Sequence, residues 1–132
     1  MKYIPLIGRI LFSLMFIMSG MGHLTNTTGM AMYAGSMGVP GPTFLVIISG
    51  IMIVVGGFSV LLGYKVKIGA ILLVVFLIPT TFIMHPFWAI EDPMQSQVQM
   101  AMFFKNLSML GGALLFYYFG TGPLSLEEQT QQ

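Results

Sequence analysis

The sequence contains no cysteine and very little charge. Without cysteine, the chain cannot form a disulfide, carry out thiol redox chemistry or bind a metal through thiolates. Only 7% of its 132 residues are charged, whereas an ordinary soluble domain has about 25%. A water-soluble protein this small could not cover its surface with so few charges, so the sequence predicts a protein that lies in the lipid bilayer. The net charge of +1 gives no indication that the protein binds nucleic acid.

The common catalytic signatures are also missing. The sequence has no recognisable catalytic triad, no paired carboxylates expected in a cleft, no phosphate-binding glycine loop and no HExxH motif. This argues against an autonomous hydrolase or nucleotide enzyme. Any redox role would need a bound cofactor, a metal on other ligands, or a partner protein.

Four apolar stretches are long enough to cross a bilayer, which takes roughly 20 mostly apolar residues. They do not alternate in polarity as barrel strands do, and open sheet edges cannot lie in lipid. The sequence therefore predicts one all-α domain over residues 1–132, an integral membrane four-helix bundle. The first stretch has a basic start, but its long apolar run and the lack of a clean cleavage site predict a retained helix rather than a secretory signal. The expected helices cover about residues 4–24, 43–62, 66–84 and 100–119.

The basic residues predict the orientation. The amino end and the link between the second and third helices carry lysine or arginine, whereas the links 25–42 and 85–99 carry none. By the positive-inside rule, both termini are expected in the cytoplasm and the two uncharged or acidic links outside. The basic residues on the predicted inner side are Lys2, Arg9, Lys65 and Lys67.

Small residues and one proline predict how the helices pack. Glycine and serine at helical spacing let membrane helices approach closely. The spaced pairs are Gly50 with Gly57, Ser49 with Gly56, and Ser108 with Gly112. Pro79 lies inside the third helix, where Thr80 or Thr81 could bond a carbonyl that the proline frees.

Polar residues far apart in sequence are expected to meet at the outer end. Ionisable residues inside a membrane are costly and mark functional sites. His23 and His85 end the first and third helices, and Lys105 lies about one and a half turns below the outer surface. The full set is His23, His85, Trp88, Glu91, Asp92, Lys105 and Asn106.

Each of these residues also has a structural interpretation. Trp88 would be an interfacial anchor, the two histidines would be hydrated at helix ends, and Arg9 would snorkel to the cytoplasmic headgroups. Lys105 would either snorkel, pair with Glu91 or Asp92, or face the bundle interior as a functional cation.

Methionine is abundant, with 13 residues, and a thioether with an imidazole is a ligand set that copper can use. Met15, Met18 and Met21 recur on one helix face, and Met30 and Met32 follow His23. The methionines within a membrane helix need no metal to pack, so the sequence favours ordinary packing over copper, and we predict no metal site.

Five segments in the same order resemble the DoxX family of bacterial inner-membrane proteins. They extend through nearly the whole chain: GRILFSLMFIMSGMGHL, MGVPGP, HPFW, FFKNLSMLGGALL and GTGPLSLEE. The resemblance implies a four-helix protein related to the small subunit of thiosulfate:quinone oxidoreductase and to quinone-detoxification proteins. Many relatives carry lysine where this chain has His23. The residues that the resemblance singles out are Arg9, His23, His85, Trp88, Lys105 and Asn106.

The leading hypothesis is a subunit of a membrane oxidoreductase that binds a quinone or a small oxidised sulfur compound near the outer surface. Lys105 would stabilise a developing oxyanion, and His23 and His85 would donate hydrogen bonds or relay protons. Other membrane or periplasmic subunits would be the partners. The alternative is a non-catalytic accessory subunit of a larger membrane complex, and a small-solute carrier is a third interpretation. The expected ligand-binding residues are Asn106, Trp88, Arg9 and Glu91, with Pro79 and Trp88 shaping the mouth of the site.

Overall fold

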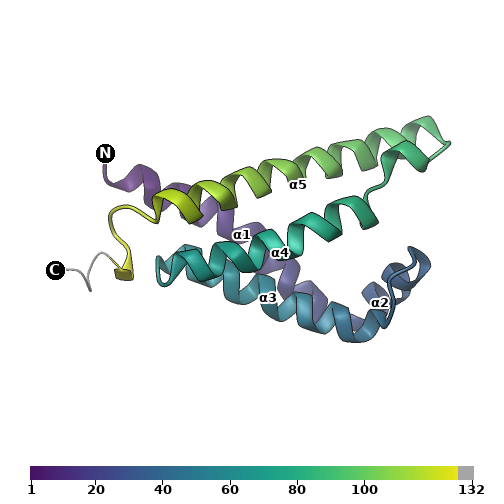
Figure 1. Cartoon of the computed structure of the whole chain (residues 1–132), viewed down its shortest axis with the longest axis horizontal. Helices are drawn as coiled ribbons and strands as arrows, with labels where there is room; N and C mark the ends of the chain where they lie inside the picture. Colours follow the sequence, from purple (N-terminus) through teal and green to yellow (C-terminus); the bar gives the residue numbers. More distant parts are fainter. Residues whose placement is uncertain (128–132) are drawn as a thin grey trace.

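The computed structural model describes residues 1–127, and the regular elements in this part of the chain are helices (Figure 1). Four helical segments are long and apolar enough to cross a membrane, which confirms the predicted all-α membrane bundle. The elements are α1 (Tyr3–Thr25), α2 (Thr27–Ser36), α3 (Pro42–Leu62), α4 (Val66–Met84), the short 3₁₀ helix η1 (Phe87–Ala89) and α5 (Pro93–Phe119).

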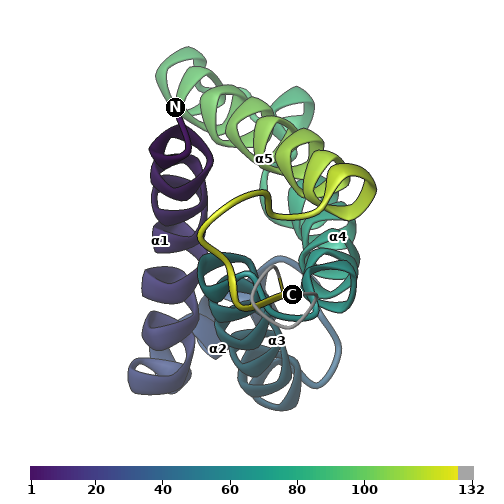
Figure 2. The ribbon, with the colours of Figure 1, turned by 90° about the vertical axis from the view of Figure 1, so that its left-hand side faces the viewer.

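The membrane-spanning helices form two pairs that diverge. α1 packs on α3, α3 on α4, and α4 on α5. The pair α1–α3 separates from the pair α4–α5 toward the end that carries α2 and η1 (Figure 1). The amino terminus and the last described residues lie at the opposite end, where the segment after α5 crosses the ends of the helices (Figure 2). Side chains from α1, α3, α4 and α5 fill the centre: Phe16, Ile53, Val60, Leu73, Leu77 and Ala113.

Glycines allow the closest helix contacts. A methyl group added at Gly20 would lie 2.9 Å from the carbonyl oxygen of Gly50, so α1 and α3 touch backbone to backbone. A methyl group at Gly112 would lie 2.8 Å from the Phe12 ring, which joins α5 to α1. Gly56 and Gly57 are also buried against neighbouring helices, as predicted. Ser108 is exposed instead, and its hydroxyl donates to the Phe104 carbonyl of its own helix.

Two helical segments lie within the predicted outer links. The link 25–42 contains α2, and α5 begins at Pro93 rather than near residue 100. Asp92 caps α5 by accepting a hydrogen bond from the Gln95 amide at 3.4 Å, and proline suits the first turn because it has no amide hydrogen to satisfy. The polar first turns of α5 lower the local hydropathy, so a search for apolar runs misses them.

Arg9 is fully buried at the inner end, with 0% of its surface exposed. Its Nη2 donates to the Leu124 carbonyl at 2.6 Å, and the Glu127 amide donates to the Gly63 carbonyl at 2.9 Å. The segment after α5 thus folds back over the bundle. The expectation that Arg9 snorkels to the headgroups was wrong, because the returning chain supplies an acceptor inside the protein. Glu128, the last acid of the GTGPLSLEE segment, lies outside the described residues.

Pro79 does not end α4, which continues to Met84. The Thr81 hydroxyl donates to the Leu77 carbonyl at 2.5 Å, so it bonds the carbonyl four residues back rather than the one that Pro79 frees.

Candidate functional site

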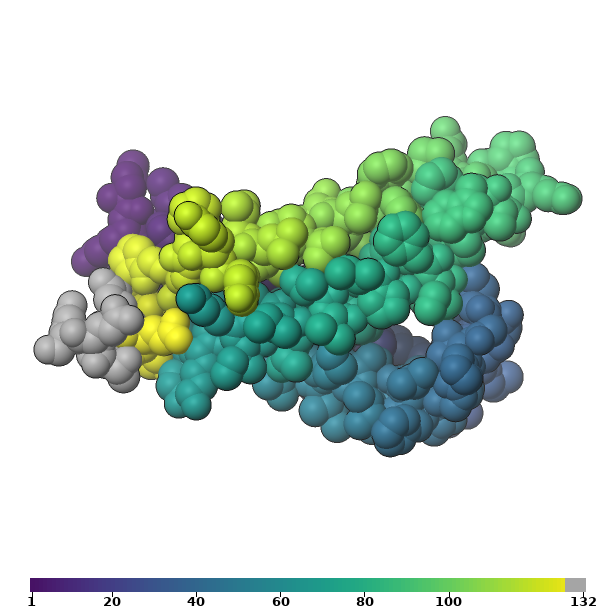
Figure 3. Space-filling model, in the orientation of Figure 1, coloured from purple at the N-terminus to yellow at the C-terminus, as the bar shows by residue number. Residues whose placement is uncertain are grey.

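A cavity of about 470 Å³ lies where the two helix pairs diverge. The space-filling view shows the molecule hollowed between α2 and the outer part of α4 (Figure 3). Its walls are largely apolar and come from α1, α2, α3, α4 and α5. The polar side chains among the lining residues are Ser19, His23, Tyr33, Ser49, Thr80, His85, Lys105 and Asn106.

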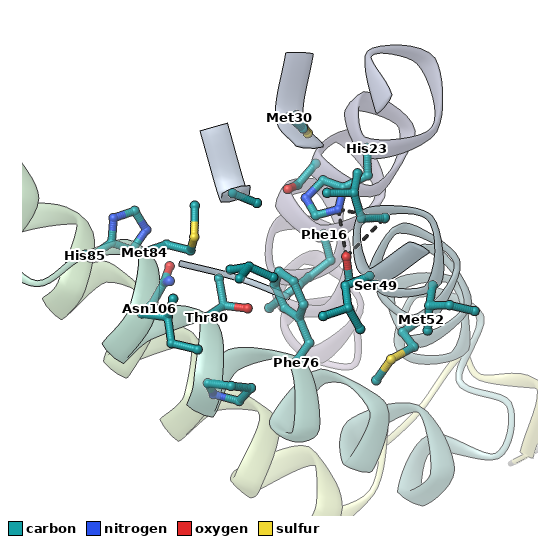
Figure 4. Close-up of a pocket in the computed structure, with 18 of the residues that line it drawn as sticks. Phe16, His23, Met30, Ser49, Met52, Phe76, Thr80, Met84, His85 and Asn106 are labelled. Carbon is teal, nitrogen blue, oxygen red and sulfur yellow. Dashed lines mark hydrogen bonds between the residues drawn. The ribbon is translucent and has the colours of Figure 1, made fainter. Parts of the chain in front are cut away.

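His23 forms one wall from the last turns of α1. Its Nδ1 lies 3.0 Å from the Ser49 hydroxyl and 3.3 Å from the Val46 carbonyl of α3 (Figure 4). The ring also meets Phe76 of α4 edge-on, with the centroids 6.0 Å apart. These contacts fix the orientation of the imidazole between α1 and α3 while it lines the cavity.

His85 forms the facing wall at the C-terminal end of α4 (Figure 4). Its Nδ1 lies 2.7 Å from Gln99 Oε1. Gln99 is in position because α5 begins at Pro93, so the two turns that the sequence analysis assigned to a loop hold this histidine. His23 and His85 thus line the same cavity, at the end of the bundle where the sequence predicts them to lie.

Asn106 and Lys105 contribute from α5 in different ways. Asn106 is only 5% exposed and lines the cavity. Its side-chain amide, which can both donate and accept, is available to a molecule in the cavity. Lys105 also lines the cavity but is exposed, and its Nζ lies 3.5 Å from Met102 Sδ on the same helix.

Three predicted ligand-binding residues lie away from this cavity. Trp88 is 58% exposed and packs against the rings of Phe87 and Phe103, with centroids 5.2 and 5.7 Å away. This packing fits an interfacial anchor, and Pro79 rather than Trp88 lines the cavity. Glu91 is exposed outside it, and Arg9 is at the opposite end of the bundle.

The acidic residues do not reach Lys105 in the way the ion-pair interpretation requires. Glu91 and Asp92 are exposed, neither lines the cavity, and the Asp92 carboxylate caps α5. Lys105 is therefore placed at the edge of the cavity as a solvent- or lipid-accessible cation.

Sequence reasoning did not assign Ser49, Thr80 or Gln99 to the site. Ser49 was considered for packing and Thr80 for the proline, yet both line the cavity, and Gln99 holds His85. In the sequence, Ser49 and Thr80 stand out only as polar residues within apolar runs. This feature points to a site only once the fold shows which face of the helix each residue occupies.

A second cavity of about 590 Å³ adjoins the first toward the outer links. Tyr33 and Met84 line both cavities, and Gln95 and Gln99 line the outer one. Two glutamine side chains therefore lie on the approach to the site from this end.

The methionines do not converge on one point. Met15 and Met30 line the cavity with His23, whereas Met18 is 64% and Met32 73% exposed. Among residues 1–127, no three histidine or acidic side chains are grouped to hold a metal ion. The methionines of the cavity act as part of its apolar wall.

Comparisons with known proteins agree with the architecture. The DoxX family profile matches residues 4–86. The inner membrane protein YqjF of Escherichia coli is 33% identical over 122 residues, covering 92% of this chain and 88% of YqjF. YphA, also an E. coli inner membrane protein, is 31% identical over 124 residues, covering 94% of this chain and 88% of YphA.

A more distant similarity extends to a eukaryotic protein. The Surfeit locus protein 4 homolog of Schizosaccharomyces pombe is 30% identical over 129 residues, which are 96% of this chain and 37% of that protein. No solved structure matches the chain.

Proposed function

The chain belongs to the DoxX family of multi-pass inner-membrane proteins, and on this premise we propose that its cavity binds a quinone or a small oxidised sulfur compound for a membrane oxidoreductase. The observation that carries the proposal is the buried Asn106 amide, which lines an apolar cavity together with two oriented histidines. The electron-carrying centre would belong to the ligand or to a partner subunit.

The size and lining of the cavity fit a small lipophilic ligand. Ligand sites are typically about 300–1,000 Å³, mostly apolar, with a few fixed polar groups that orient the ligand. The cavity of about 470 Å³ has this composition. It lies between membrane-spanning helices that diverge, so a molecule dissolved in lipid can approach it without crossing water (Figure 1).

The lining residues would have distinct roles. Asn106, His23 and His85 would hydrogen-bond the polar end of the ligand, and the histidines would pass protons between ligand and outer solvent. Lys105, at the edge, would stabilise negative charge that develops on a ligand oxygen. Met15, Phe76 and Met109 would contact the apolar body.

The placement of Lys105 and His85 favours this proposal over a non-catalytic accessory subunit. In the accessory interpretation, these polar residues would form a closed network or face a partner. Both instead line the cavity, and His85 is held by Gln99 rather than by Lys105. The accessory role remains the outcome to which a negative binding result would point.

A cavity-filling pair of variants tests the proposal. Thr80→Phe places a ring in the cavity, whereas Ile78→Phe places the same ring on the lipid-facing side of the same helix. Both proteins would be purified in nanodiscs, and the binding of a short-tailed quinone, thiosulfate and sulfite would be measured by calorimetry. We expect Thr80→Phe to abolish binding of one of these and Ile78→Phe to preserve it. No binding by the unmodified protein, or equal binding by both variants, would contradict the proposal.

Lys105→Met tests the charge. This change preserves the length of the side chain and removes the cation. We expect redox turnover in native membranes, with partner proteins present, to fall by about tenfold or more, since electrostatic stabilisation acts mainly on the transition state. Turnover equal to that of the unmodified protein would exclude the role of Lys105.

A further inference from the structure

We infer that the cavity recognises its ligand through hydroxyl groups, so that a hydroquinone or another phenol binds more tightly than the corresponding quinone. This inference rests on the proposed function only in requiring that the cavity bind a small lipophilic molecule. It concerns which hydrogen-bonding groups that molecule presents, and it follows from the hydrogen bonds already made by the two histidines.

The contacts of His23 identify which ring nitrogen carries the hydrogen. The Ser49 hydroxyl donates its only hydrogen to the Val46 carbonyl at 3.1 Å. The Val46 oxygen can only accept, and it also lies 3.3 Å from His23 Nδ1. A hydrogen on Nδ1 satisfies this carbonyl and the Ser49 oxygen at 3.0 Å together, so we assign the hydrogen to Nδ1. In the neutral ring, Nε2 is then an acceptor.

The contact of His85 with Gln99 leads to the same assignment of the ring hydrogen as in His23. Its Nδ1 lies 2.7 Å from Gln99 Oε1, a carbonyl oxygen that can only accept. With the amide oxygen of Gln99 turned to the ring, we assign the hydrogen to Nδ1 here too, and Nε2 of the neutral ring is again an acceptor. Among the residues that the structure describes, no protein donor reaches either Nε2.

The two acceptors lie on opposite walls of the same cavity. His23 comes from α1 and His85 from the end of α4, and Figure 4 shows them on either side of the space that Asn106 and Thr80 also face. The geometry of the five-membered ring directs Nε2 away from the contact made by Nδ1. In each histidine, the Nδ1 hydrogen is thus bonded to another group of the protein. The lone pair of Nε2 is left to accept a hydrogen bond from a molecule in the cavity.

A hydroxyl group satisfies this arrangement and a carbonyl does not. A hydroxyl donates to one Nε2 and can accept a hydrogen bond from the Asn106 amide at the same time. A quinone oxygen can only accept, so it would meet the lone pairs of the histidines and leave them unsatisfied. Sites built to bond a hydroxyl discriminate strongly against analogues that lack it, because the buried polar groups are then unpaired.

The test measures the affinities of three matched probes for the protein in nanodiscs under anaerobic conditions. The probes are decylubiquinol, decylubiquinone and the dimethyl ether of decylubiquinol, which keeps the ring and tail but has no donor. We expect the quinol to bind at least about tenfold more tightly than either of the others. Equal affinities, or tighter binding of the quinone, would overturn the inference while leaving the proposed ligand site in place. No binding of any probe would overturn both.

Two replacements of His23 distinguish the role of the Nε2 acceptor from the role of the side chain in packing. In His23→Asn the side-chain amide occupies the place of Nδ1 and can still donate to Ser49, but nothing replaces Nε2. In His23→Gln the amide reaches the place of Nε2 and can accept. We expect Asn to reduce the preference for the quinol to about threefold or less and Gln to retain most of it. An unchanged preference in His23→Asn would overturn the assignment of His23, whatever the stability of the variant.

Discussion

Arg9 and Leu124 are joined by a hydrogen bond of 2.6 Å across 115 positions of the sequence. The arginine comes from the second turn of α1, and the carbonyl belongs to the segment after α5. Leu124 has a positive φ of 60°, a conformation that costs energy for a residue other than glycine. The chain bends in this way to bring its carbonyl to the buried guanidinium, so the contact defines the inner end of the bundle.

Arg9→Met should lower the stability of the protein. The change preserves most of the volume but removes a charged donor, and hydrogen bonds to charged groups contribute about 1.5–3 kcal/mol. We expect a decrease of that size in the free energy of unfolding, measured by denaturant titration in detergent micelles. Lys2→Met is the control, since Lys2 is an exposed cation at the same end. Equal effects of the two changes would show that the contact has no stabilising role.

Gly20→Ala should destabilise the contact between α1 and α3. The added methyl group would lie 2.9 Å from the Gly50 carbonyl oxygen, and the backbone there cannot move without separating the helices. Overpacking of this kind costs about 1–3 kcal/mol. Gly111→Ala is the matched control, because nothing lies within 4 Å of its added methyl group and alanine favours the helix. Thermal unfolding would compare them, and a Gly20→Ala protein as stable as the control would contradict the packing.

Asn106→Leu should change stability and ligand binding in opposite directions. Asn106 is only 5% exposed and lines the apolar cavity, so a leucine of similar shape should raise stability by at most about 1–3 kcal/mol, the cost of a fully buried, unpaired amide. The same change removes a hydrogen bond to the ligand, and we expect the affinity to fall about tenfold, or about 1.4 kcal/mol. Unfolding and calorimetric binding would be measured on the same preparation. A loss of stability would indicate instead that the amide has a structural partner.

The orientation in the membrane can be measured directly because the chain has no cysteine. Ser36→Cys and Gln97→Cys place single thiols on exposed positions of the predicted outer links, and Tyr64→Cys places one on the predicted inner turn. A membrane-impermeant maleimide should label the first two in intact cells and the third only after permeabilisation. The opposite pattern would invert the orientation that the positive-inside rule predicts.

The sequence predicts the helices well because the pattern that defines them is local. A run of apolar residues long enough to span the hydrocarbon identifies α1, α3 and α4 to within a residue or two. The start of α5 was missed because its first turns are polar, although a capping aspartate followed by proline is a sequence signal for a helix start at this point.

The site was only partly predictable because it depends on which faces meet. Topology alone brought His23, His85 and Asn106 to one end, and the structure places all three in one cavity. Topology could not show that Trp88 turns outward onto an aromatic cluster or that Glu91 stays exposed. Arg9 illustrates the same limit, since nothing within α1 reveals that a segment more than a hundred residues away supplies its acceptor.

The divergence of the two helix pairs gives the protein a different cross-section in each leaflet. Contact between α1 and α5 through Phe12 holds the inner halves together, while the outer halves separate around the cavity (Figure 1). With the predicted orientation, the molecule is wider in the outer leaflet. Lateral pressure from the surrounding lipids would then act on the outer halves to close the angle between the pairs, so the lipid composition of that leaflet would adjust how much room the cavity offers.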